Sequence, residues 1–176
     1  NELFALDLAV LQELGAVEKS DEARRSAEQG SVIWKFTARH GFWADPLVTP
    51  DVLYITSLDH NVYALETETG RELWTTELPG AMAGSPVLSA DGAQLYVGNF
   101  DYNLYALDAA TGEQQWQVAS ENWIWGRPVL AGDQLFFGDL GGNLYAVDPA
   151  TGSVLWQQQV ADAIRAEPLY DAETGR

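Results

Sequence analysis

The sequence predicts an all-β fold, a β-propeller of four-stranded antiparallel blades, and a regular repeat is the first reason. Tryptophans recur at intervals of 40, 42 and 40 residues, at Trp34, Trp74, Trp116 and Trp156. A proline follows each tryptophan after twelve residues, at Pro46, Pro86, Pro128 and Pro168. A tyrosine precedes three of the tryptophans by eleven residues, at Tyr63, Tyr105 and Tyr145. A period of about 40 residues is typical of propeller blades.

Each period contains four stretches with the composition of short β-strands, which is the second reason. In one copy these are "PVL" from Pro128, "QLFFG" (134–138), "NLYAVD" (143–148) and "SVLWQQQV" (153–160). They are rich in β-branched and aromatic residues and are bounded by Gly, Asp, Asn or Pro. A proline suits the first residue of a strand because it donates no ladder hydrogen bond. Four such strands joined by tight turns predict one antiparallel meander.

The third reason is the turn "DAATG" (108–112) between the last two strands of a period. Its aspartate can accept hydrogen bonds from amides two or three residues further on. Its glycine supplies the left-handed conformation that closes a hairpin with a bulge. The turn returns as "DPATG" (148–152) and, with glutamate as a weaker acid, as "ETETG" (66–70). The residues expected to shape these turns are Asp108, Gly112, Asp148, Gly152, Glu66 and Gly70, and all of these except Glu66 are also expected to take part in docking one blade on the next.

A second acidic turn, "NFDYN" (99–103), has the oxygen donors of a sparse calcium loop. It returns as "SLDHN" and "DLGGN" at the same point of the other periods. We therefore interpret Asp101 and Asn103 as β-turn formers rather than metal ligands. Asn61 and Asn143 are expected to do the same.

The repeated tryptophans are expected to lie between successive blades. An indole buries on the order of 200 Å², enough to hold one sheet against the next. The alternative is a set of exposed binding residues, but exposed indoles at fixed spacing would favour aggregation.

The motif Ala-x-Asp-x-x-Thr-Gly-x-x-x-Trp stands at 106–116 and 146–156, and at 64–74 with Glu66 in the acidic position. It resembles the tryptophan-docking motif of PQQ-like (quinoprotein-type) β-propellers over essentially the whole chain. The family includes non-catalytic members such as the propeller lipoprotein of the outer-membrane barrel-assembly machinery. The resemblance implies a ring of seven or eight blades, of which about four are present, so we expect a fragment of a larger propeller.

The chain is accordingly interpreted as a single partial propeller over residues 1–176. A blade ends near Trp34 and carries an inserted segment, 8–29, whose apolar spacing suggests a short amphipathic helix. The insertion is either a tolerated surface loop or a docking element for a partner. Further blades are expected at about 35–75, 76–117 and 118–157, with the start of another at 158–176.

Composition excludes several classes of function. The formal net charge of −17, from 26 acidic and 9 basic residues, argues against nucleic acid and against an anionic membrane surface. No apolar run approaches the roughly 18 residues of a membrane span. The chain has no cysteine and only two histidines, His40 and His60, which share no ligand motif. No targeting segment is visible, and the chain opens at Asn1, so we expect the true N-terminus to be missing.

Quinone-dependent dehydrogenases of the family imply a tryptophan platform, a vicinal disulfide, a calcium ion on Glu, Asn and Asp, and an aspartate base. The disulfide is impossible here without cysteine, and the other groups map to no position of this sequence. No cofactor is identified, and PQQ and calcium would require a site supplied by further blades. The sequence therefore favours a non-enzymatic role.

Variation between periods is concentrated just before each proline, in "GFWAD", "AMAGS", "WIWGR" and "AIRAE". In a propeller these connections between blades line the central mouth, where a rigid scaffold carries its binding residues. The candidate binding residues are Trp43, Asp45, Met82, Trp123, Trp125, Arg127, Arg165 and Glu167, with Ile164 beside them in an apolar rim. Aromatic and arginine side chains are frequent interface anchors; alternatively, the tryptophans only fill the funnel.

The function these patterns favour is a non-catalytic scaffold with a protein partner, in the periplasm or at the cell surface, with or without a lipid anchor. Two alternatives remain open at this stage. One is part of a PQQ-dependent quinoprotein dehydrogenase, and the other is an extracytoplasmic sensor domain of a membrane-anchored protein.

Overall fold

The computed structural model describes residues 1–6 and 32–169. All regular secondary structure in these residues is β-strand. The strands are β1 (Glu2–Leu6), β2 (Val32–Thr37), β3 (Leu47–Val48), β4 (Val52–Thr56), β5 (Asn61–Glu66), β6 (Glu72–Glu77), β7 (Val87–Leu88), β8 (Gln94–Gly98), β9 (Asn103–Asp108), β10 (Gln114–Ala119), β11 (Val129–Ala131), β12 (Gln134–Gly138), β13 (Asn143–Val147) and β14 (Val154–Gln159).

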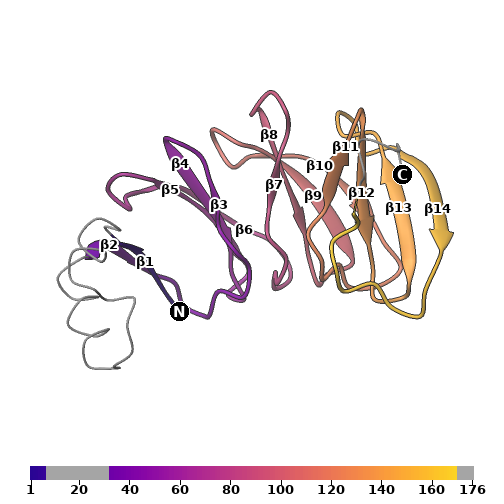
Figure 1. The fold of residues 1–176 in the computed structure, drawn as a ribbon, viewed down its shortest axis with the longest axis horizontal. Helices are drawn as coiled ribbons and strands as arrows, with labels where there is room; N and C mark the ends of the chain where they lie inside the picture. The colour runs from indigo at the N-terminus through magenta and orange to yellow at the C-terminus, as the bar shows by residue number, and fades with distance from the viewer. Residues whose placement is uncertain (7–31, 170–176) are drawn as a thin grey trace.

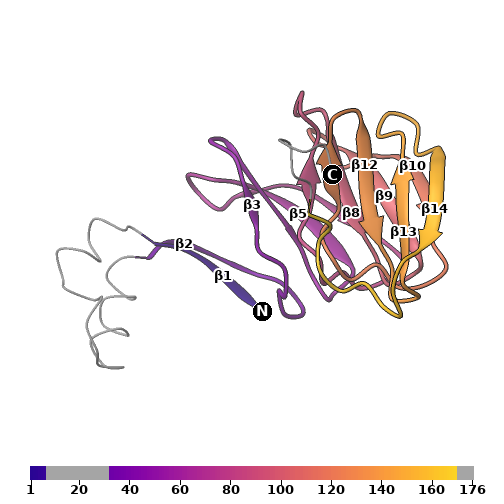
Figure 2. The same ribbon diagram turned by 45° about the vertical axis from the view of Figure 1, so that its right-hand side comes forward.

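The strands form separate antiparallel sheets that follow one another along the chain. Strands β3–β6, β7–β10 and β11–β14 each make a four-stranded meander in chain order, and β1 pairs with β2 in a two-stranded sheet. Figures 1 and 2 show the sheets in succession from the N-terminal to the C-terminal end of the molecule. Successive four-stranded meanders of this kind are propeller blades, so the predicted fold class, an all-β propeller fragment of about four blades, is confirmed.

Apolar side chains meet between neighbouring sheets rather than within any one of them. Val62 and Ala64 of β5 share a core with Leu95 and Val97 of β8. A second core joins the β7–β10 and β11–β14 sheets, and a third joins the β1–β2 pair to the β3–β6 sheet. Each sheet is thus held by the sheets next to it, as in other repeat proteins.

The turn between the last two strands has the predicted conformation. Its glycine has a positive φ in all three copies, 69° at Gly70, 77° at Gly112 and 72° at Gly152. The strand pairing shifts register beside each turn, which is the expected bulge. One carboxylate oxygen of Asp108 accepts hydrogen bonds from the amides of Ala110 and Thr111, at 3.0 and 2.9 Å.

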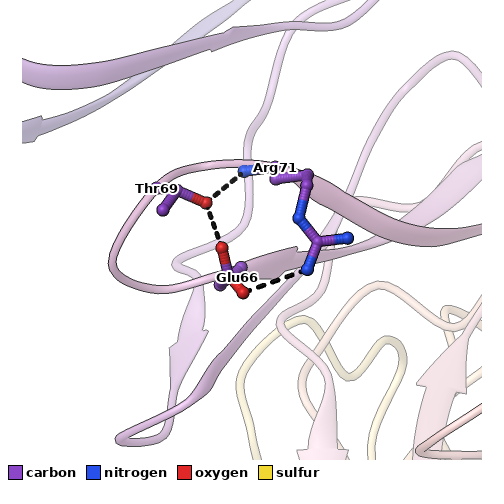
Figure 3. Close-up of polar contacts among 3 residues, drawn as sticks. All are labelled: Glu66, Thr69 and Arg71. Atoms are coloured by element: carbon purple, nitrogen blue, oxygen red, sulfur yellow. Dashed lines mark hydrogen bonds and ion pairs between the residues drawn. The ribbon is translucent and has the colours of Figure 1, made fainter.

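Glu66 holds its turn in a different way. Its carboxylate accepts a hydrogen bond from the Thr69 hydroxyl and lies 3.0 Å from the Arg71 guanidinium (Figure 3). The Thr69 hydroxyl, followed by the Arg71 guanidinium, holds the pKa of Glu66 below its usual range. The longer glutamate therefore closes the turn through side chains, whereas Asp108 accepts from two backbone amides as well as from the Thr111 hydroxyl.

Three repeat tryptophans lie against the turn of the next sheet. A Cβ atom on the turn glycine would come within 2.4 to 2.6 Å of the indole or its neighbour, so only glycine fits beneath it. The pairs are Trp34 on Gly70, Trp74 on Gly112 and Trp116 on Gly152. Each indole also donates to a carbonyl of the same turn, Thr67, Ala109 or Pro149, at 2.8, 3.0 and 3.2 Å.

Trp156 differs from the other three. It lies on β14, the last described strand, is 40% exposed, and contacts Phe136 of its own sheet. Within the described residues its indole makes no hydrogen bond, so its docking stays a prediction. The expected insertion, 8–29, falls in residues 7–31, which lie outside the described residues, as do residues 170–176 of the expected further blade.

Candidate functional site

The connections between sheets are fixed by hydrogen bonds to the sheets on both sides. In the connection from β6 to β7, the carbonyl of Ala81 accepts from Phe100 of the following sheet. The amide of Met82 donates to Ser57 of the preceding sheet. The connection from β10 to β11 repeats both bonds through Trp123 and Ile124. These two segments therefore have a defined backbone geometry although they are not strands. We call the four segments that follow β2, β6, β10 and β14 the mouth connections; they span residues 38–46, 78–86, 120–128 and 160–168.

The mouth connections turn some side chains into the protein and leave others exposed. Met82 and Ile124 occupy the inward position and are both fully buried. Ile164 occupies it in the next connection and packs on Gly138, where a Cβ atom would come within 2.3 Å of it. The prediction that Met82 belongs to the binding rim is therefore wrong, because its side chain fills the core between two sheets.

Neighbouring mouth connections also pack directly on one another. A Cβ atom on Gly84 would lie 2.8 Å from the carbonyl oxygens of Trp125 and Gly126, and one on Gly126 would lie 2.7 Å from that of Ala166. Small residues at this position let three connections stack side by side. The outward side chains on either side of it are consequently brought close together.

An aromatic cluster results at the mouth, formed by Trp43, Phe100, Trp123 and Trp125. Phe100 stacks on Trp123 and on Trp125, with ring centroids 5.1 and 5.2 Å apart. Trp43 contacts Trp125 at 5.8 Å, although it comes from a connection two sheets away. Trp43 is 63% and Trp123 is 42% exposed. The cluster is both ordered by its own contacts and open to solvent at its two ends.

Phe100 was missed in the sequence although a signal was present. It lies in the turn between β8 and β9, and the same position is Leu58 and Leu140 in the neighbouring sheets. An aromatic residue where the other copies have leucine marked a departure from the repeat. Spacing alone did not show that this turn reaches the mouth connections.

A cavity of about 360 Å³ lies beside the cluster. Six of the eight candidate binding residues line it: Trp43, Asp45, Trp125, Arg127, Arg165 and Glu167. Of the other two, Trp123 lies at the far end of the aromatic cluster and Met82 is buried. The Arg127 guanidinium lies 3.9 Å from the Glu167 carboxylate. The structure thus brings six of the predicted residues, two tryptophans and four charged side chains, together in one site.

The acidic turns that bond to the mouth connections are also closed by their own hydrogen bonds. Asp59 accepts from the hydroxyl of Tyr63 at 2.8 Å and from the amide of Asn61 at 3.2 Å. Burial raises the pKa of Asp59, but these and other hydrogen bonds outweigh it, so the pKa lies below its usual value. Asp101 is paired in the same way with Tyr105 and Asn103, as expected of turn formers.

A quinone and calcium site does not fit the described residues. No group of three or more His, Asp or Glu side chains able to hold a metal ion occurs in residues 1–6 and 32–169, and the sequence has no cysteine. Carboxylates such as Asp59 and Asp101 are already engaged in their turns.

The family of the chain is decided by a match over most of its length. The family model described as outer membrane protein assembly factor BamB matches residues 19–174. The chain belongs to this family. Its PQQ-like propeller repeat, inferred above from the tryptophan motif, is thereby confirmed. A search of curated proteins gave no match.

Solved structures similar to this BamB-family chain include BamB from Moraxella catarrhalis, with a TM-score of 0.66 and 22% identity over 76% of this chain and 42% of that one. The quinohemoprotein alcohol dehydrogenase ADHIIG from Pseudomonas putida HK5 has a TM-score of 0.61 and 26% identity, over 69% of this chain and 21% of that one. The WD40 repeats of RRP9 have a TM-score of 0.67 and 17% identity, over 75% of this chain and 43% of that one. The chain spans less than half the length of each of these structures, and the two below 25% identity show the fold alone.

None of the described residues forms a helix long and apolar enough to cross a membrane.

Proposed function

We propose that the chain is part of a non-catalytic propeller scaffold that binds a protein partner through the aromatic cluster at its mouth, outside the cytoplasm. The observation that carries this proposal is the cluster itself. Trp43 and Trp123 expose 63% and 42% of their surface, yet Phe100 and Trp125 connect them through ring contacts. Large aromatic side chains held in a fixed arrangement are typical hot spots of protein interfaces.

Two further facts support a binding role. The connections from β6 to β7 and from β10 to β11 are held by backbone hydrogen bonds to both neighbouring sheets, so a partner would meet a surface that is already ordered there, which lowers the cost of association. The family model describes an assembly factor of the outer membrane. That description favours a protein partner and an extracytoplasmic location for this chain.

The experiment places a photo-crosslinking amino acid at position 43 in the complete protein, expressed in its own host. We expect one defined protein to be captured there. A matched position is 91, which is exposed in the turn between β7 and β8, at the opposite end of the sheets. No capture of that protein is expected at position 91.

The double substitution Trp123→Ala with Trp125→Ala should abolish this capture while changing the melting temperature little. Phe100→Ala should weaken the capture, because it removes the ring that joins the two indoles. A large loss of stability in the double variant would show that these tryptophans are core residues. Equal capture at positions 43 and 91 would also contradict the proposal.

A further inference from the structure

The cavity at the mouth carries opposite charges that do not meet. Asp45 lines it from the connection between β2 and β3, and Arg165 lines it from the connection that follows β14. Neither side chain forms an ion pair with any described residue, whereas Arg127 and Glu167 lie 3.9 Å from each other. Asp45 and Arg165 are therefore the charges left for a ligand.

An apolar surface lies between these two charges in the order of the connections. Trp43 stands two residues before Asp45, and Trp125 occupies in its own connection the position that Arg165 has in the next. The two indoles contact each other at 5.8 Å. A ligand that fills the cavity would thus contact a carboxylate, two indoles and a guanidinium.

The charge of the whole chain restricts the occupant. A net charge of −17 disfavours a second copy of this chain and any polyanion, because like charges repel across an interface. A purely basic segment would match Asp45 but would meet Arg165 without a counter-charge. The site is best matched by a segment that carries both signs.

We propose that the mouth binds an extended segment of a partner protein in which a basic and an acidic side chain flank apolar residues. The basic side chain pairs with Asp45 and the acidic one with Arg165, while the apolar residues lie on Trp43 and Trp125. This inference rests on the proposed function, that the mouth is a protein-binding surface, and it adds the chemistry of the segment.

The test uses four short synthetic peptides without tryptophan, each with two central leucines. One carries lysine and glutamate on either side, one carries lysine and glutamine, one carries glutamine and glutamate, and one carries two glutamines. Binding to the complete protein, labelled with fluorotryptophan, is followed by fluorine NMR of Trp43 and Trp125. Because exposed ion pairs contribute modestly, we expect the doubly charged peptide to bind about three- to tenfold more tightly than the neutral one.

Protein variants assign each end of the peptide. In Asp45→Asn, the doubly charged peptide should bind no better than the peptide with glutamate alone. In Arg165→Gln, it should bind no better than the peptide with lysine alone. Both variants change exposed side chains, and a matched control is Asp133→Asn, an exposed carboxylate away from the cavity, which should leave all four affinities unchanged.

The outcomes separate this inference from the proposed function. Equal affinity for all four peptides, with shifts confined to Trp43 and Trp125, would overturn the charge pattern and leave the mouth as a binding surface. A charge preference that survives Asp45→Asn and Arg165→Gln would overturn it as well. If no peptide shifts these indoles, the inference is wrong, and the crosslinking at position 43 then decides the proposed function separately.

Discussion

The hydroxyl of Tyr54 and the indole of Trp74 donate to the same oxygen, the carbonyl of Ala109 in the next sheet, at 3.1 and 3.0 Å. The two rings also contact each other, with centroids 5.9 Å apart. The next interface repeats this arrangement with Tyr96 and Trp116 on the carbonyl of Pro149. One carbonyl thus fixes two large side chains of the preceding sheet.

Tyr54→Phe removes one of the two donors and should lower the free energy of unfolding by about 0.5–1.5 kcal/mol. The loss is limited because the carbonyl of Ala109 keeps the bond from Trp74. Urea unfolding of the variant and the wild type measures the difference. Tyr102→Phe is the matched control, since Tyr102 is 46% exposed and its hydroxyl bonds to no described residue. Equal losses in both variants would contradict the role of the shared carbonyl.

Gly112→Ala tests the contact between the turn and the indole. Its Cβ would lie 2.5 Å from Thr76 Oγ1 and 2.6 Å from the Trp74 ring, on a backbone with φ of 77°. We expect a loss of about 3 kcal/mol or more in the free energy of unfolding, because strain and displaced packing add.

The control for this variant is Gly92→Ala. Gly92 has a similar φ of 75°, but nothing lies within 4 Å of its Cβ position. Only backbone strain should lower the free energy of unfolding there, by about 1–2 kcal/mol. Denaturant unfolding of both variants isolates the contribution of docking, and a cost at position 112 no larger than that at position 92 would show that the indole contact contributes nothing.

Asp59 should make the stability depend on pH in the acid range. Its pKa in the folded protein lies below its usual value because hydrogen bonds from Tyr63, Asn61 and other donors outweigh burial. A depressed folded pKa contributes stability that is present above the unfolded pKa of about 4 and is lost as the pH falls through the folded value. Unfolding of the wild type should therefore become easier below about pH 4.

Asp59→Asn should be less stable than the wild type at neutral pH and should show a smaller decline in acid. Chemical unfolding at a series of pH values, monitored by circular dichroism, gives both quantities. Asp133→Asn changes an exposed aspartate without side-chain hydrogen bonds to described residues and should follow the wild type. An identical pH profile for Asp59→Asn would contradict the assignment.

The strands and turns could be predicted because their signals are local. The stretch "QLFFG" is β12 to the residue, and Gly112 has the positive φ that its turn requires. A part for this glycine in blade docking was expected from the motif, but its place directly beneath the Trp74 ring was not. That contact depends on how the next sheet is placed, and no local pattern records it.

The candidate site was predicted only in part because the mouth connections have no strand periodicity to read. All the large apolar side chains of these segments were predicted to form one rim, although Met82 is buried in the core and Trp43 is exposed. The contact between Trp43 and Trp125 joins connections separated by two sheets. The connection that carries Trp43 is held to the next one by a hydrogen bond from the Asp45 amide to the Ser85 hydroxyl, and Gly84 there packs on the backbone of Trp125 and Gly126. Sequence spacing shows neither contact.

The indoles of Trp34, Trp74 and Trp116 each pack on a turn that belongs to the following repeat, and that repeat carries its own tryptophan at the same position. Any unit can therefore stand after any other, so genes of this kind should gain or lose whole repeats by unequal recombination without creating a mismatched junction. The segments before the prolines differ in sequence from repeat to repeat, so they can change while the architecture stays constant.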